Sequence, residues 1–298
     1  LGNICGGLFT LLLLSKELLQ IKLVFDKAIW KEVMKYSYPL VIVGLGGMVN
    51  DVLSRLIYRH VVDLPIDQAD HELGVFANIF RMAAEPFFFK HSESKNAQQT
   101  YARVMKFFVI ACCFMFLFIG LFLDVFKWIF VHFANPRWAE GLQVVPLLAL
   151  GNIFLGIYYN LSIWYKLTNK NIYGAYITIA GAIITILLNV TLIPHLHYAG
   201  AAIATFCCYF LMMVISYKLG QKFYPVPYSV KKLSLYIFTA VALYLIHWMV
   251  TLWVPGSLLF SIIAGILLLA VFTRLIGFTE AKDLVKLPVV GRFYKQKA

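Results

Sequence analysis

Long apolar runs constrain the fold of this chain more than any other feature of its sequence. The 298 residues are 61% hydrophobic and 13% charged, whereas a soluble globular domain is closer to half apolar and a quarter charged. About 20 apolar residues in a helix cross the ~30 Å hydrocarbon core of a bilayer. Helices also satisfy every backbone N–H and C=O group, which a lipid environment demands. The sequence therefore predicts an all-α polytopic membrane protein.

The apolar runs give one partial and eight complete predicted spans. The chain opens with LGNICGGLFTLLLL, which has the pattern of the end of a spanning helix rather than of a signal peptide, so we expect a fragment that lacks an N-terminal part. The complete spans are predicted at 38–58, 73–89, 107–131, 142–165, 173–193, 200–219, 233–253 and 257–276.

Lysine and arginine alternate with these spans in a regular way. Of the 26 such residues, 21 fall in loops or at span ends on one side of the predicted bilayer. Arg59, Lys127 and Arg137 fall in the opposite loops, and Arg55 and Arg81 lie within spans. Because short loops rich in Lys and Arg stay in the cytoplasm, the pattern predicts a cytoplasmic C-terminus. It also accounts for the net charge of +12 without a nucleic-acid partner.

Two segments outside the spans have a composition suited to the membrane surface. Residues 15–37 mix Lys with Leu, Ile, Phe and Trp, which is typical of an interfacial amphipathic linker. Residues 277–298 form a basic tail, for which the simplest partner is the anionic lipid of the bilayer.

Four charged residues lie inside apolar segments and are the strongest functional signal. Asp51 and Arg55 are spaced i,i+4, and Arg81 and Glu85 repeat that spacing, so a helix places each pair on one face. Such a residue costs about 2.5–3.5 kcal/mol at the centre of a spanning helix and by default marks a transport pathway. The alternative is that each pair neutralises itself and only joins two helices.

Polar residues in the later spans suggest a cation site. Thr178, Thr185 and Asn189 fall on one helical stripe, and Thr205 lies in the next span. Together with Asp51, the oxygen atoms of Thr185, Asn189 and Thr205 could hold a hard cation such as Na⁺. The alternative is that these side chains only form hydrogen bonds between helices.

Motifs of catalysis and of metal binding are missing from the sequence. There is no G-x-S-x-G, H-E-x-x-H, P-loop or G-x-G-x-x-G, so we predict that the chain is not an enzyme. The five cysteines lack ligand spacing and are interpreted as small packing residues, and no cofactor is expected. His247, alone on an apolar helix, is expected to be packed and hydrogen-bonded.

Four stretches together resemble a known family. They read FDKAIWKEVMKYSYPLVIVGL, ELGVFANIFRMAAEP, EGLQVVPLLALGNIFLGIYYNLSIWYKLTNK and LLNVTLIPHLHYAGAAIATFCCYFLMMVISYKLGQKFYP. In order and loop length they are similar to helices seven to twelve of bacterial polysaccharide-biosynthesis (Wzx-type) flippases. These belong to the multidrug/oligosaccharidyl-lipid/polysaccharide exporter superfamily, whose fold has two six-helix lobes and often two further helices.

The resemblance implies a division of the chain into parts of that fold. The chain would pair with the N-terminal lobe of the same protein, and it would lie in the bacterial inner membrane. The parts would be the end of helix six (1–14), a cytoplasmic inter-lobe linker (15–37), the second six-helix lobe (38–219), a cytoplasmic loop (220–232), two additional helices (233–276) and a basic cytoplasmic tail (277–298).

The resemblance also implies a cargo and roles for the charged residues. The cargo would be an undecaprenyl-diphosphate-linked oligosaccharide, moved by alternating access. Arg81 matches a cavity arginine that serves the lipid diphosphate in related lipid II flippases, and Arg55 and Glu85 are further substrate-site candidates. A sodium site of those flippases matches Asp51, Thr185, Asn189 and Thr205. Asn189 replaces an expected carboxylate, so coupling to Na⁺ or H⁺ stays open.

Two other functions fit parts of the sequence. A drug or cation antiporter of the same superfamily would need an unpaired acidic residue in its cavity, whereas Asp51 and Glu85 each have an arginine one turn away. A membrane scaffold subunit would use the charges only for pairing. The paired carboxylates favour the flippase over the antiporter.

Overall fold

The computed structural model describes residues 26–61, 96–133, 142–253 and 257–281, and within 46–61 it describes the backbone alone. In these ranges the chain is helical, with short turns and no β-strand. The all-α prediction is therefore confirmed for the described chain. Contacts divide the chain into two compact units, Leu1–Tyr38 and Pro39–Ala298. Except for the start of α3, the structure below belongs to the second unit.

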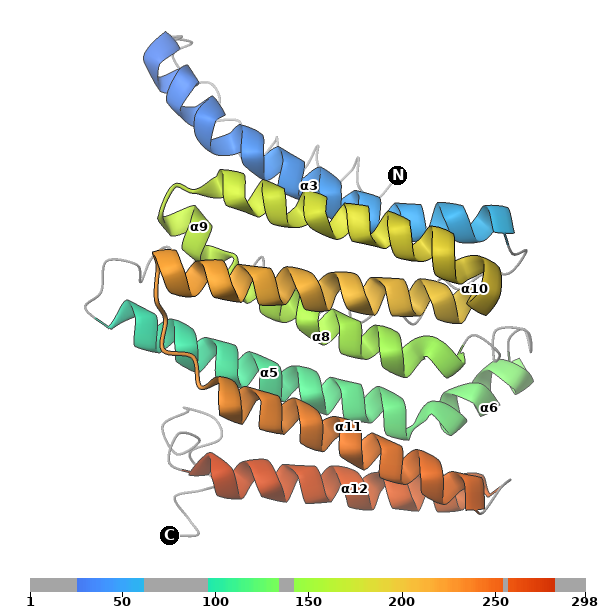
Figure 1. Cartoon of the computed structure of the whole chain (residues 1–298). Helices are drawn as coiled ribbons and strands as arrows, with labels where there is room; N and C mark the ends of the chain where they lie inside the picture. The colour runs from blue at the N-terminus through green and yellow to red at the C-terminus, as the bar shows by residue number, and fades with distance from the viewer. Residues whose placement is uncertain (1–25, 62–95, 134–141, 254–256, 282–298) are drawn as a thin grey trace, which may run out of the picture. The chain divides into compact units, whose positions relative to one another are not determined.

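From α5 onward, the helices follow one another with few residues between them (Figure 1). Five stretches of the described chain are long and apolar enough to cross a membrane, at Ala97–Leu121, Leu142–Leu167, Asn171–Phe223, Val230–Trp253 and Leu258–Thr279. The elements are α3 (Lys27–Val61), α5 (Ala97–Leu121), α6 (Leu123–Phe133), the 3₁₀ turn η1 (Leu142–Val144), α8 (Val145–Leu161), α9 (Ile163–Leu167), α10 (Asn171–Phe223), α11 (Val230–Trp253) and α12 (Leu258–Thr279).

Local sequence signals explain where several helices begin. The Asp26 carboxylate accepts hydrogen bonds from the backbone N–H groups of Ala28 and Ile29 and so caps α3. Ser257 caps α12 by accepting a hydrogen bond from the N–H of Phe260 at 3.3 Å. Proline at the first turn of α8 is tolerated because its missing N–H would have no helical partner there.

The longest helix, α10, is a hairpin of two arms rather than one rod. Its 53 residues would extend about 80 Å if straight, far more than one bilayer crossing. At His197 the backbone leaves helical geometry, with φ 49° and ψ −129°, and the second arm returns beside the first (Figure 1). The Cys208 thiol contacts the Gly181 carbonyl at 3.4 Å across the two arms. The two predicted spans at 173–193 and 200–219 correspond to these arms.

The reversal of α10 leaves no space for a side chain at Gly200. A Cβ atom there would lie 2.6 Å from the carbonyl oxygen of Leu192 and 2.7 Å from its carbonyl carbon, both of which are backbone atoms. Backbone cannot move aside as a flexible side chain can. Glycine at this position is therefore a requirement of the tight turn.

One predicted span is part of a longer, broken helical stretch. We predicted a helix over 107–131, but α5 begins at Ala97 and breaks at Phe122, after which α6 continues to Phe133. Arg103 and Lys106, which the sequence pattern assigned to a loop, therefore lie on α5. Lys106 is tolerated within the helix because it forms an ion pair with Glu280.

Helix α5 links two groups of helices in the Pro39–Ala298 unit. It contacts α8 on one side and α11 and α12 on the other (Figure 1). Aromatic pairs fill the second interface: Phe114 meets Phe272 edge to face at 4.9 Å, and Phe116 meets Tyr244 at 5.8 Å. The pair α11 and α12 is thus attached to the described chain mainly through α5.

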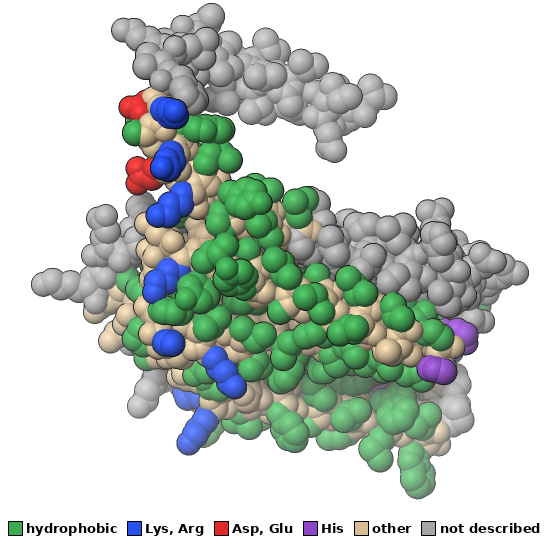
Figure 2. Space-filling model, turned by 45° about the horizontal axis from the view of Figure 1, so that its top comes forward, with side chains coloured by type: hydrophobic (Ala, Val, Ile, Leu, Met, Phe, Trp, Pro, Cys, Tyr) green, Lys and Arg blue, Asp and Glu red, His purple; other side chains and the backbone are tan. Residues whose placement is uncertain are grey.

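Basic side chains gather at one end of these helices and histidines at the other (Figure 2). The first turns of α5 and α11 and the last turns of α9, α10 and α12 meet at the basic end (Figure 1). The residues concerned are Arg103, Lys106, Lys166, Lys170, Lys218, Lys222, Lys231 and Lys232. The helix directions therefore bring together cations that the sequence places in separate loops.

Candidate functional site

The charged pairs of the predicted pathway are only partly covered by the structure. Asp51 and Arg55 lie in α3, which is helical without interruption across both, so their positions are one turn apart on one face as predicted. The directions of their side chains are not described. Arg81 and Glu85 lie outside the described residues, and their roles stay predictions.

The polar stripe of the first α10 arm lies in the interior of the described helices. Thr185 is 1% exposed and Asn189 0%, and Thr178 is equally buried. The Thr178 hydroxyl donates a hydrogen bond to the Gly174 carbonyl at 2.8 Å and lies 3.4 Å from the Tyr158 hydroxyl of α8. The prediction that these residues share one face of a helix is confirmed, and at Thr178 that face meets α8.

Two of the proposed cation ligands, Thr185 and Thr205, have side-chain surroundings that differ. Thr205, on the second α10 arm, donates its hydroxyl to the Ala201 carbonyl of its own helix at 3.0 Å. Within the described chain the Thr185 hydroxyl has no hydrogen-bond partner. Since a buried hydroxyl without a partner is costly, the Thr185 oxygen is suited to receive a ligand or water. The joint site with Asp51, Asn189 and Thr205 stays a prediction.

A second buried amide lies on α8. Asn160 is 2% exposed, and among the described residues neither its amide nitrogen nor its amide oxygen has a hydrogen-bond partner. A buried amide in an apolar helix normally costs free energy unless both atoms are bonded. Asn160 is therefore a further position at which a polar ligand could bind inside the bundle.

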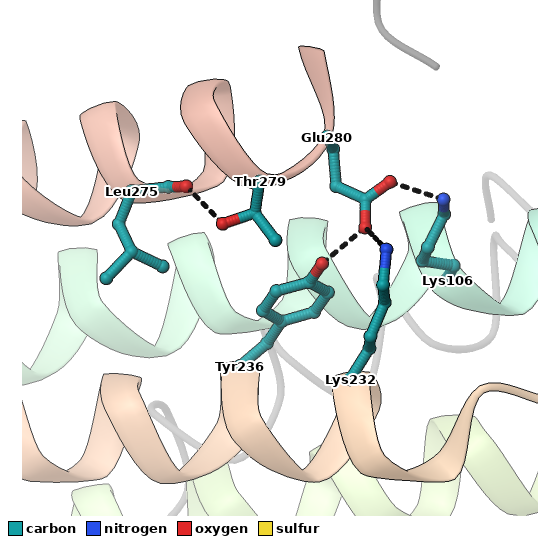
Figure 3. Close-up of polar contacts among 6 residues, drawn as sticks. All are labelled: Lys106, Lys232, Tyr236, Leu275, Thr279 and Glu280. Atoms are coloured by element: carbon teal, nitrogen blue, oxygen red, sulfur yellow. Dashed lines mark hydrogen bonds and ion pairs between the residues drawn. The ribbon is translucent and has the colours of Figure 1, made fainter. Parts of the chain in front are cut away.

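A buried acidic residue at the basic end was missed by the sequence analysis. Glu280 follows α12, its side chain is 2% exposed, and it accepts from three donors on two other helices (Figure 3). Lys106 of α5 lies 2.5 Å from Oε2, while Lys232 at 3.1 Å and the Tyr236 hydroxyl at 2.5 Å, both from α11, contact Oε1. The cluster joins α5, α11 and α12.

Opposing effects act on the pKa of Glu280. Burial raises the pKa of this carboxyl, but hydrogen bonds from Lys106, Tyr236 and Lys232 and the charge of Lys106 outweigh it, so the pKa is lowered from its ordinary value of 4.5. Glu280 is therefore ionised at neutral pH. Its two oxygens accept from donors on α5 and α11, so Glu280 ties the end of α12 to both helices.

A second polar cluster lies at the opposite end of the same helices. Ser261 of α12 donates its hydroxyl to the Asp124 carboxylate of α6 at 2.6 Å. His247 of α11 is 4% exposed, and its Nε2 lies 3.1 Å from the Ser261 carbonyl and 3.5 Å from the Ser261 hydroxyl. The expectation that His247 is packed and hydrogen-bonded is confirmed. Its contacts are with Ser261 of α12, which sequence spacing could not reveal.

The geometry thus separates two kinds of polar group. The Glu280 cluster pairs its charges and ties helix ends together. Thr185 and Asn160 instead have buried oxygen and nitrogen atoms that form no hydrogen bond within the described chain.

Comparison with known proteins adds no relative, since the sequence matches no protein-family model and no curated protein.

Proposed function

We propose that this chain is the C-terminal lobe of a flippase that moves an undecaprenyl-diphosphate-linked oligosaccharide across the bacterial inner membrane for surface polysaccharide synthesis. The observation that carries the proposal is the Asp51–Arg55 pair one turn apart in helix α3, within the predicted span at 38–58. Charged side chains in such a helix are costly unless they face a partner or a water-filled cavity. A lipid diphosphate passing through a cavity is a suitable partner for arginine.

The chemistry of the cargo matches the charges of the predicted pathway. A guanidinium is always ionised and can donate two parallel hydrogen bonds to phosphate oxygens. Arg81 and Arg55 would hold the diphosphate, while Glu85 and Asp51, one turn away in the sequence, would orient the two arginines between transport cycles. Alternating access of two lobes would then carry the head group from one membrane face to the other.

The proposed orientation follows from the basic end of the helices. The cations at the ends of α5, α9, α10 and α11 would face the cytoplasm together with the C-terminus. The cargo would then load at the basic end, where positive charge attracts an anionic lipid head.

Substitution of Arg81 tests the proposal in cells. In a strain deleted for the gene, we expect loss of a surface polysaccharide and accumulation of its lipid-linked precursor on the cytoplasmic side. The Arg81→Ala gene should fail to restore the polysaccharide, whereas Lys127→Ala, which changes an exposed lysine of α6 away from the basic end, should restore it. Unchanged surface glycan with altered drug tolerance would indicate the antiporter instead.

A second variant separates transport from stability. Asn160→Leu removes a buried amide that lacks partners in the described chain and puts an apolar side chain of similar volume in its place, so it should not lower stability. If Asn160 belongs to the transport cavity, this variant should reach the membrane in normal amounts and transport poorly. Normal transport by both Asn160→Leu and Arg81→Ala would favour a scaffold, and the flippase proposal would be rejected.

A further inference from the structure

We propose that Lys170 and Lys222, which lie at the two ends of the α10 hairpin, together bind the phosphate of an anionic phospholipid of the bilayer. The acyl chains of this lipid would lie along an apolar stripe of the first α10 arm. The inference concerns a resident lipid rather than the transported one, so it goes beyond the proposed function. Only the assignment of the site to the cytoplasmic leaflet depends on the proposed orientation.

The turn between α9 and α10 brings Lys170 to the end of the second α10 arm. Asn169 in this turn has φ 53°, a left-handed conformation that asparagine adopts more readily than most residues. The Lys170 Nζ atom then lies over the ring of Phe223, the last residue of α10, at 3.6 Å from the ring centre. The Lys222 Nζ atom lies 5.7 Å from the centre of the same ring. Two cations from opposite ends of α10 therefore share one aromatic side chain.

The Phe223 ring is itself held by other aromatic side chains. Trp164 of α9 stacks on it, with ring centres 5.6 Å apart and planes at 18°, and Tyr173 contacts it at 5.1 Å. The Trp164 Nε1–H group donates a hydrogen bond to the Ser216 hydroxyl at 3.3 Å. Because these contacts fix the ring, they also limit the positions of the Lys170 ammonium, which reduces the entropy lost when an anion binds.

The lysine pair has no carboxylate beside it among the described side chains of the Pro39–Ala298 unit. The carboxylates of these side chains are Asp124 and Glu280. Asp124 lies on α6 at the opposite end of the helices, and Glu280 is already bonded to donors of α5 and α11. Two like charges near one ring repel each other, so an anion that contacts both of them is stabilising.

The lysine pair also lies where a bilayer places its phosphate groups. The membrane-crossing stretches on either side of Lys170 end at Leu167 and begin at Asn171, and the stretch that contains Lys222 ends at Phe223. Trp and Tyr side chains, which surround the pair, are enriched at this interface. Phospholipid headgroups are the phosphates most abundant at this depth, and lysine stems are flexible enough to bring both ammonium groups onto one of them.

An apolar stripe begins next to the lysine pair and runs along the first α10 arm. Its members share one face of the helix, and each is between 40% and 60% exposed: Ile172, Tyr176, Ile179 and Ile183. An acyl chain can lie against this face while its phosphate stays at the lysines. Basic side chains border a hydrophobic surface on the whole molecule as well (Figure 2). A cationic end followed by an apolar face favours a lipid over free phosphate.

A phosphate held by both lysines would connect the two arms of α10 at the end away from their turn at His197. The first arm begins directly after Lys170, and the second ends at Phe223, so the connection would close the hairpin. We therefore expect the bound lipid to raise the melting temperature of the protein.

Lipid titration of the whole protein tests the proposal. The protein is delipidated in detergent, and native mass spectrometry compares binding of phosphatidylglycerol with binding of phosphatidylcholine that carries the same acyl chains. We expect phosphatidylglycerol to bind more tightly and to raise the melting temperature more. Lys170→Gln/Lys222→Gln should weaken phosphatidylglycerol binding roughly 25-fold, because each lysine near an anionic surface contributes about fivefold. Should the double variant not fold, each single substitution should weaken binding about fivefold.

Two further variants separate this site from the general charge of the basic end. Lys218→Gln/Lys231→Gln removes the same charge from other exposed positions at that end and should leave the affinity nearly unchanged. Phe223→Leu keeps both cations but removes the ring that positions Lys170, and it should weaken binding about two- to fivefold.

Three results would overturn the proposal. Equal losses of affinity in the two double variants would show only a general attraction of basic residues to anionic lipid. Inorganic phosphate that binds as tightly as phosphatidylglycerol would indicate a site for a free anion. An isoprenoid diphosphate that binds far more tightly, and is lost in Lys170→Gln/Lys222→Gln, would indicate a cargo site. Because binding is measured without transport, failure here is distinguishable from failure of the flippase test.

Discussion

Lys106 and Glu280 are 174 positions apart in the chain, yet the Lys106 Nζ and Glu280 Oε2 atoms lie 2.5 Å apart. Lys232 and Tyr236 complete the cluster from α11. Three helices that are separate in sequence are thus joined by one carboxylate. An ion pair of this kind adds little net stability, because burying its two charges costs desolvation free energy. Removing one partner is nevertheless destabilising, because the other charge is then buried without compensation.

Removal of the Glu280 charge should destabilise the protein. Glu280→Gln keeps the shape of the side chain but leaves Lys106, whose side chain is 12% exposed, without a counter-charge. We expect the free energy of unfolding to fall by about 2–3 kcal/mol. This loss is at or just below the usual range for breaking a buried ion pair, because Lys232 is half exposed and water can solvate its charge. Thermal unfolding in detergent measures it. Glu32→Gln, at an exposed position of α3, is the matched control. Equal melting temperatures for Glu280→Gln and Glu32→Gln would contradict a stabilising role of the Glu280 cluster.

The Glu280 cluster should also make stability depend on acidic pH. Because the folded-state pKa of Glu280 is lowered from 4.5, its contribution is fully present above that value and is lost as pH falls through the lower folded-state pKa. We therefore expect stability to decrease below about pH 4.5, and to decrease less steeply in Glu280→Gln. Denaturation followed from pH 7 to pH 3 gives both slopes. Parallel slopes for the two proteins would show that Glu280 is not the responsible carboxyl.

A glycine pair tests the reversal of α10. Gly200→Ala introduces a Cβ atom 2.6 Å from the Leu192 carbonyl oxygen, so the two arms must separate locally. We expect a cost of about 2 kcal/mol or more, in the range of overpacked sites. Gly44→Ala on α3 meets no atom within 4 Å and should be neutral or stabilising by about 0.5–1 kcal/mol, because alanine favours helix. The melting temperature of Gly200→Ala should therefore be lower than that of Gly44→Ala. A lower melting temperature for Gly44→Ala would contradict the turn geometry.

The sequence predicted helices well where length and apolarity alone decide them. The spans at 233–253 and 257–276 agree with α11 and α12 to within a few residues, since a run of apolar residues with polar ends has one natural length in a bilayer. The break between the α10 arms was also predicted. Its narrow form, with a single non-helical residue at His197, depends on the contact between Gly200 and Leu192 and could not be seen in a hydropathy pattern.

The features that the sequence did not predict involve polar residues whose partners are distant in the chain. The start of α5 was missed because Lys106 looked like a loop cation, and its ion pair with Glu280 could not be seen in the sequence. The Asp124–Ser261–His247 cluster escaped notice for the same reason, because each residue is unremarkable on its own helix. Of the predicted site, the burial of Thr185 and Asn189 followed from helical spacing, whereas their ligands depend on packing that spacing does not specify.

The two polar clusters lie at opposite ends of α11 and α12 and bind them to α5 and α6 respectively. A sliding motion of this pair along α5 would have to break charged contacts at one end and a buried hydroxyl contact at the other. These four helices are therefore held together at both ends. Across the seam between α5 and α8, a Cβ on Gly156 would lie 2.4 Å from the ring of Phe108, so that this close approach of the two helices depends on glycine.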